Sequence, residues 1–195
     1  MSALLVEVSE KVDRLRSVLS RGRYLRAEFP PGVELDNAEQ LAGYRRTMEY
    51  YFASGHLPVE ARAGLDELTL PRAMVELYRI TAHPKSGRIS LFQAFDKGEI
   101  MDPHGWAHRD DEHWLAVGSV ADDKFLVSLI TGEVMFADHQ FSRPGEVDTT
   151  RIIAPDLLTF FDECMIGPRY GEFVSAADLT DPAGWFRFLQ DNDLA

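Results

Sequence analysis

The sequence predicts an α+β fold, in which an antiparallel meander of about five or six strands is packed against helices. The first observation is the stretch 113–139, which holds three apolar segments rich in β-branched and aromatic residues. These segments are 114–120, 125–130 and 133–137. The second is the shortness of the steps between them, since the glycine of Thr131-Gly132 supplies the positive φ of a hairpin turn. The third is an amphipathic helical pattern on both sides of the stretch.

The segment before the meander is predicted to be helical. The first twenty residues form an amphipathic helix, and a second helix runs from Asp36, which forms a capping-box pattern with Glu39, to Gly55. A short helix is expected at 61–68, and a clearer one starts at Leu70-Pro71. The apolar face of the first helix is Leu5, Val8, Val12, Leu15 and Leu19. The apolar face of the helix that starts at Leu70-Pro71 is Met74, Val75 and Tyr78.

Further strands and helices flank the meander on both sides. A strand within 88–95 and a partner at 99–101 form a first hairpin around Asp96-Lys97-Gly98, and a last short strand is expected at 149–153. A helix follows Pro155, with Asp156 beside its positive end. Its apolar residues, spaced i, i+3, i+4, i+7 and i+8, are Leu157, Phe160, Phe161, Cys164 and Met165. A final short helix bears Trp185, Phe188 and Leu189.

Length and composition predict a single domain over 1–195, with 1–57 as a helical N-terminal elaboration and 68–190 as the core. The single cysteine, Cys164, excludes an intrachain disulfide and any metal site built on paired cysteines. The first ten residues carry glutamates where a signal peptide carries bases, and no apolar run reaches the length of a membrane span. We therefore expect a cytoplasmic protein without a membrane partner.

The charge of the chain argues against nucleic acid and in favour of a basic partner. The net charge is −12 and the pI is about 4.9, so phosphate backbones are repelled. Between Asp110 and Asp148, nine acidic residues stand against only two basic ones. Such a face steers a basic protein toward it. The alternative interpretation of the same charge is ordinary solubility of an acidic protein.

The most informative local signature is Trp114-Leu-Ala-Val-Gly-Ser-Val, followed by Asp122-Asp-Lys-Phe-Leu-Val-Ser-Leu-Ile-Thr-Gly-Glu-Val and by an acidic-led helix with Phe160-Phe161. This order resembles the SMI1/KNR4 superfamily, also called SUKH. In that family a strand with an aliphatic-glycine step precedes an acidic turn, a strand ending in Thr-Gly or a similar pair, and a strand running Glu/Lys-Val-aromatic. The similarity covers roughly 68–190, and its most specific parts are 115–138 and 157–165.

The resemblance implies an α+β domain with a curved antiparallel sheet and helices packed against it. Many bacterial members are immunity proteins that bind and neutralise a cognate toxin, often a nuclease or another polymorphic-toxin effector, and others are regulatory binding proteins. It therefore implies a non-catalytic protein-binding module, without a cofactor, whose partner is a cognate toxin. A regulatory protein with an intracellular client is a further alternative, and the sequence leaves a homodimer open. The first sixty residues and the loop around Trp106 depart from the family pattern.

Acidic residues and one tryptophan around the meander are the candidate partner-binding residues. Trp106 lies in a polar loop among carboxylates, and an aromatic residue in such surroundings is typical of a hot spot for a Lys- or Arg-rich partner. Trp114, at the start of an apolar strand, is expected in the core instead. The complete candidate set is Trp106, Asp110, Asp111, Glu112, Asp122, Asp123 and Asp138.

A rival interpretation is a small enzyme or a metal-binding protein that uses the loop 104–113. The residues concerned are His104, His108 and His113, with Asp110 and Asp111 beside them. Zinc requires three or four such groups to converge. Because Pro103 and Gly105 argue against a helix here, the spacing of four loses its usual meaning, and a solvated loop is favoured. Loss of activity or folding on chelation, with stoichiometric metal in the protein, would support the rival.

Other catalytic arrangements are also disfavoured. Cys164 lies between Phe161 and Met165 on an apolar helix face, which predicts a buried thiol rather than a nucleophile. Asp122 and Asp123 are consecutive turn residues whose side chains point apart, so a solubilising turn is favoured over an acid/base pair. The sequence contains no phosphate-binding glycine loop, nucleophile elbow or His-Glu metalloprotease motif. We therefore expect neither enzymatic activity nor a bound metal.

Overall fold

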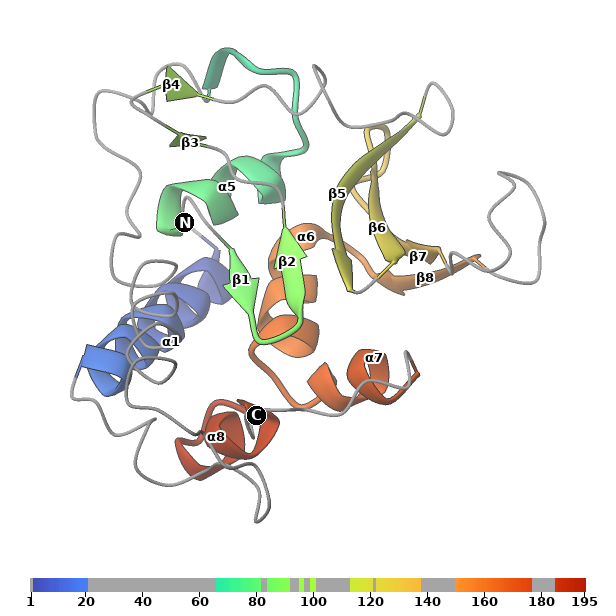
Figure 1. The fold of residues 1–195 in the computed structure, drawn as a ribbon. Coiled ribbons are helices and arrows are strands. Elements are labelled where there is room, and N and C mark those ends of the chain that lie inside the picture. Colours follow the sequence, from blue (N-terminus) through green and yellow to red (C-terminus); the bar gives the residue numbers. More distant parts are fainter. Residues whose placement is uncertain are drawn as a thin grey trace.

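The computed structural model describes residues 2–20, 66–81, 84–91, 95–96, 99–100, 113–120, 122–137, 150–176 and 185–195. Within these ranges the chain has an α+β architecture (Figure 1). The helices are α1 (Ala3–Ser20), α5 (Arg72–Ile80), α6 (Leu157–Phe160), the π-helix η3 (Phe161–Met165), α7 (Tyr170–Ala176) and α8 (Trp185–Asp191). The strands are β1 (Lys85–Ser86), β2 (Ile89–Leu91), β3 (Phe95–Asp96), β4 (Glu99–Ile100), β5 (Trp114–Val120), β6 (Asp123–Ser128), β7 (Val134–Ala137) and β8 (Thr150–Ala154).

The main sheet has six antiparallel strands in the order β1-β2-β5-β6-β7-β8, and β3 and β4 form a separate two-stranded hairpin. Neighbours in the main sheet are also neighbours along the chain, except at the step from β2 to β5, which passes over that hairpin. The predicted α+β class with an antiparallel meander is confirmed. Strand β1, which pairs with β2 across Gly87, was not predicted.

The connection between β6 and β7 differs from the predicted two-residue turn. Strand β6 ends at Ser128, so the prediction that it extends to Ile130 was wrong. The Ser128 hydroxyl accepts hydrogen bonds from the N–H groups of Ile130 at 3.3 Å and Thr131 at 3.0 Å, and this local bonding replaces the ladder between the strands. Gly132 has a φ of +82°, as its place in the hairpin required. Ile130 therefore lies in a turn, with 71% of its surface exposed.

One face of the main sheet forms the core together with the helices. Figure 1 shows α1, α5 and α6 on the same side of strands β5 to β8. The Phe125 ring lies 4.7 Å from that of Phe160 and 5.7 Å from that of Phe173, measured between ring centroids. Buried residues on this sheet face include Ile89, Leu91, Leu115, Val120, Phe125, Val127, Val134 and Phe136. Trp114 alternates with Leu115 and is only half-buried, so its side chain lies on the opposite face of the sheet. The prediction that Trp114 belongs to the core was therefore wrong.

Helix α1 docks on the same core through its apolar stripe. Val8, Val12 and Leu15 are fully buried, as their spacing predicted. Lys11 of α1 donates to a carboxylate oxygen of Asp162 at 2.7 Å, and both side chains are largely shielded from solvent. This ion pair joins the first helix of the chain to η3.

The segment after β8 starts as an α-helix and becomes a π-helix. Asp156 caps α6, because its carboxylate accepts from the Thr159 N–H at 2.8 Å. The chain then widens into η3 at Phe161, a change that the apolar spacing did not predict. The five apolar residues predicted to face the core here are all buried. Helix α7, which follows Gly167, was not predicted either.

Strand β8, at one edge of the main sheet, carries a β-bulge, and the side chain of Arg169, the residue before α7, bonds to the backbone of this bulge. Val134 pairs with Ala154 and Met135 with Ile152, so Ile153 is the extra residue. Arg169 donates from its guanidinium to the Ile153 carbonyl at 2.9 Å. The same guanidinium contacts carboxylates of Glu163 and Glu172. The carbonyl of the extra residue therefore has a side-chain partner.

Several predictions fall outside the described ranges. These are the helix from Asp36 to Gly55, the polar loop around Trp106 and the polar loop at 140–147. In the part of the chain that the structure describes, no helix combines the length and the apolar character that crossing a membrane requires.

The β1–β2 hairpin is held by the C-terminal helices. The Trp185 indole donates to the Ser86 hydroxyl at 2.7 Å, and the Tyr170 hydroxyl accepts from the Arg88 N–H at 3.1 Å. Gly87, between these contacts, has a φ of +54°. A Cβ at this position would collide with the Tyr170 hydroxyl and would lie 2.8 Å from the Trp185 ring. The hairpin therefore requires glycine for both conformation and space.

We predict that Gly87→Ala lowers the free energy of unfolding by about 2–5 kcal/mol, because the left-handed backbone and the collision both add cost. Gly132→Ala is the matched control, since Gly132 also has a positive φ but a Cβ there would meet only Pro71, at 3.9 Å. We expect a loss of about 1–2 kcal/mol for the control. Urea denaturation followed by circular dichroism measures both. Equal losses would contradict the role of packing at Gly87.

Candidate functional site

The structure describes two of the seven predicted partner-binding residues. Asp122 is exposed, and Asp123 is the first residue of β6, where it pairs with Val120 of β5. The two carboxylates therefore mark one end of the β5–β6 hairpin, and the turn after Ser128 lies at the other end of β6. The remaining five lie outside the described ranges: Trp106, Asp110, Asp111, Glu112 and Asp138.

The structure describes only one of the three histidines of the rival metal interpretation. His113 is exposed and directly precedes β5, and its carbonyl accepts from the Leu129 N–H at 2.8 Å. His104 and His108 lie outside the described ranges. Among the residues that are described, no three His, Cys, Asp or Glu side chains converge as metal ligands would. The rival interpretation therefore remains a prediction about the loop 104–113.

Cys164 is buried inside η3, on the face that the sequence assigned to the core. Burial raises the pKa of the Cys164 thiol to about 12, and the nearby Arg169 lowers it only in part. Because this pKa is far above neutral pH, the thiol keeps its proton and is a poor nucleophile. The side chain acts as a small apolar residue between Phe161 and Met165.

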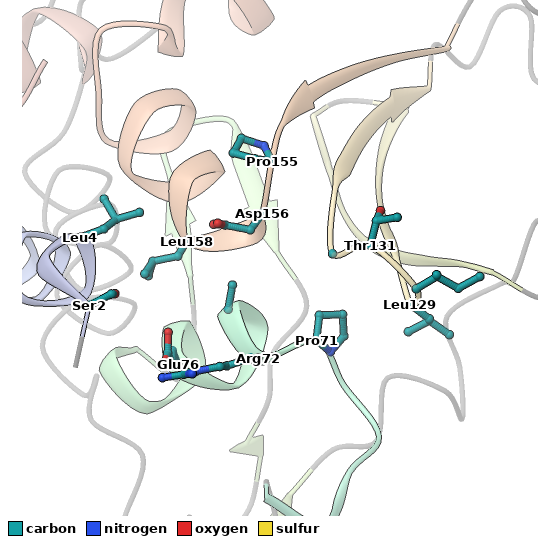
Figure 2. Close-up of a pocket in the computed structure, with 13 residues that line it drawn as sticks. Ser2, Leu4, Pro71, Arg72, Glu76, Leu129, Thr131, Pro155, Asp156 and Leu158 are labelled. Carbon is teal, nitrogen blue, oxygen red and sulfur yellow. Dashed lines mark hydrogen bonds and ion pairs between the residues drawn. The ribbon is translucent and has the colours of Figure 1, made fainter.

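A groove of about 540 Å³ is the candidate binding site among the described residues. Figure 2 shows it between the start of α1, the start of α5, the junction of β8 with α6, and the β6–β7 turn. Its apolar lining comes mainly from Leu4, Leu129, Ile130 and Leu158. Because the groove is open, its lining can meet the surface of another molecule.

The β6–β7 turn supplies the most exposed apolar side chain of the groove. Ile130 is 71% exposed, against 51% for Ile152 and 37% for Val6, the other exposed large apolar residues in the described ranges. The Ser128 hydroxyl accepts a hydrogen bond from the Ile130 N–H, and the Ser128 carbonyl accepts one from the Gly132 N–H at 2.9 Å. These bonds hold the turn. Ile130 is therefore presented on a backbone that is already ordered.

The polar lining of the groove leaves one negative charge without an ion-pair partner. Arg72 and Glu76 form a pair at 2.8 Å, in which the Arg72 side chain is 82% exposed and the Glu76 side chain only 13%. Asp156 caps α6, and no cation in the described ranges pairs with its carboxylate. The groove thus combines an apolar floor with an uncompensated carboxylate at its α6 side (Figure 2).

The start of α5 adds backbone donors to this lining. Pro71 is the N-cap and has no side chain that can accept a hydrogen bond. The N–H groups of Met74 and Val75 bond to the Pro71 carbonyl, at 3.0 and 3.2 Å. The first two helical N–H groups, those of Arg72 and Ala73, have no acceptor in the described part of the chain. They can donate to a bound molecule at the groove.

Sequence reasoning did not identify the groove. Its walls come from segments that are far apart in the chain, and Ile130 was assigned to a strand. The available signals were the start signals of three helices, at Ser2, Pro71 and Asp156, but nothing local indicates that these starts meet. No family model matches the chain, and neither the curated proteins nor the solved structures include a significant match.

We predict that Cys164 of the folded protein reacts with a thiol reagent at pH 8 at least about a hundredfold more slowly than that of the urea-unfolded chain, because burial keeps the thiol protonated and out of contact. Absorbance on reaction with a disulfide reagent measures both rates, and Cys164→Ser provides the blank. Fast labelling of the folded protein would show that the thiol is accessible and reactive, against the core assignment.

Proposed function

We propose that this protein is a non-catalytic binding module of the SMI1/KNR4 type, and that it acts as an immunity protein by binding and neutralising a basic toxin protein. The observation that carries the proposal is the groove, whose lining includes both the exposed Ile130 and the Asp156 carboxylate, which forms no ion pair within the described ranges. Exposed apolar groups rimmed by charge are a feature of protein interaction sites. The family resemblance over 115–138 and 157–165 supports the same proposal.

The charge of the chain supports a basic partner in particular. A net charge of −12 attracts a positively charged protein and raises its rate of association. Phosphate-rich partners are repelled by the same field. A basic toxin domain, such as a nuclease that binds nucleic acid through its own positive surface, has the complementary charge.

The roles of the reactive groups favour binding over catalysis. Glu76 is paired with Arg72, and Asp156 caps α6, so both acids at the groove serve the fold. Cys164, with its raised pKa, lies in the core. Inhibition by covering the surface of a toxin requires none of these groups to react.

The proposal predicts that the reading frame next to this gene encodes a large protein with a toxin-like C-terminal domain, and that domain, if it is present, is the partner used in the test. Co-expression of the two proteins should restore growth that the toxin domain alone prevents, and the purified pair should form a stoichiometric complex in calorimetry. Absence of a complex and of growth rescue would contradict the proposal.

We predict that Asp110→Lys combined with Asp111→Lys weakens this complex by about tenfold or more at low salt, because a basic partner loses attraction and meets new repulsion. The loss should shrink as salt is added. The matched control is Glu10→Lys with Glu67→Lys, which makes the same charge change at two exposed positions outside the acidic stretch 110–148. Calorimetric titration at several salt concentrations compares the two. An equal loss in both variants would remove the 110–111 segment from the interface.

A further inference from the structure

We infer that the groove beside the β6–β7 turn binds a short segment of the basic partner, in which a large apolar side chain is followed closely by a lysine or arginine. This inference rests on the proposed function and names the surface and the chemistry of recognition. The size of the groove supports a segment rather than a whole domain, because about 540 Å³ accommodates only a few side chains.

The apolar part of the segment is recognised by the β6–β7 turn. Ile130 is 71% exposed and lines the groove together with Leu129 and Leu158, which are at least partly buried. A partner side chain placed here removes the Ile130 surface from water and extends the existing core outward. Because the turn is held by the Ser128 hydroxyl and by Gly132, little ordering of this protein is required on binding.

The basic part of the segment is recognised by Asp156. Its carboxylate uses one oxygen to cap α6 and has no cation beside it in the described ranges. The Arg72 charge is already balanced by Glu76, whose side chain is 13% exposed. A lysine or arginine that approaches Asp156 therefore meets net attraction, and an acidic side chain meets repulsion.

The segment is a peptide because the groove also offers backbone donors. The N–H groups of Arg72 and Ala73, at the uncapped start of α5, lie at the lining and can bond to carbonyl oxygens of an extended chain. Apolar, cationic and carbonyl groups within a few residues of one another are what a basic protein segment supplies.

The test selects peptides from a displayed library of random twelve-residue sequences on the full chain. Selected sequences should share a large apolar residue within a few positions of Lys or Arg. Ile130→Ser should weaken their binding by about tenfold or more, the loss expected when a buried isoleucine contact is removed. Ile152→Ser is the matched control, since Ile152 is 51% exposed but lies on strand β8 and is not among the residues that line the groove, so it should leave binding unchanged.

The charge preference is tested with Asp156→Asn, which keeps a capping side chain at α6 and removes the negative charge. Binding should weaken by roughly threefold to tenfold at low salt, and its dependence on salt should decrease. Circular dichroism confirms that each variant is folded. Selection of no peptide, equal effects of Ile130→Ser and Ile152→Ser, or an unchanged salt dependence in Asp156→Asn would overturn the inference.

The same variants separate this inference from the proposed function. If the toxin domain binds the wild-type chain and Ile130→Ser equally well, the groove is not the recognition surface and this inference fails, whereas the proposed function then rests on the measured binding, the family resemblance and the net charge. If the toxin domain does not bind the wild-type chain, the proposed function fails, whereas the peptide selection still decides whether the groove recognises a basic apolar segment.

Discussion

The packing of Phe125 against the helices is the interaction on which the rest of the structure depends. Phe125 lies near the middle of the sheet, and its ring contacts those of Phe136, Phe160 and Phe173, within 4.7–5.7 Å between centroids. These contacts fix α6 and α7 against β6 and β7, and burial of such rings is a large share of the stability of a domain of this size. Because β8 runs directly into α6, they also fix the junction at Asp156.

The groove is a consequence of that packing. With α6 held against the sheet and α5 held against α6, the β6–β7 turn has to pass the start of α5, and α1 closes the remaining side through its Lys11 contact with Asp162. These elements bring together the starts of α1, α5 and α6 and the β6–β7 turn. The N–H groups at the start of α5 and the Ile130 side chain of the turn are left available for contact with another molecule.

The comparison of sequence with structure shows which physical effects are local. Val8, Val12 and Leu15 were predicted correctly because helical periodicity is a property of a short window. Ile130 was assigned to a strand because its type favours one, whereas the Ser128 hydroxyl decides the turn. The change to a π-helix at Phe161 and the convergence of Ser2, Pro71 and Asp156 depend on contacts between distant segments, so no local pattern could predict them. The acidic candidates were chosen by charge alone, and of these the structure describes only Asp122 and Asp123.

The bulge at Ile153 has a consequence for how the protein meets other chains. An edge strand with regularly spaced N–H and C=O groups is a template on which a foreign strand can add. In β8 the bulge breaks that spacing, and the Arg169 guanidinium donates a hydrogen bond to the Ile153 carbonyl. Growth of the sheet by addition of a foreign strand at β8 is thereby discouraged, so this edge does not favour strand-to-strand aggregation.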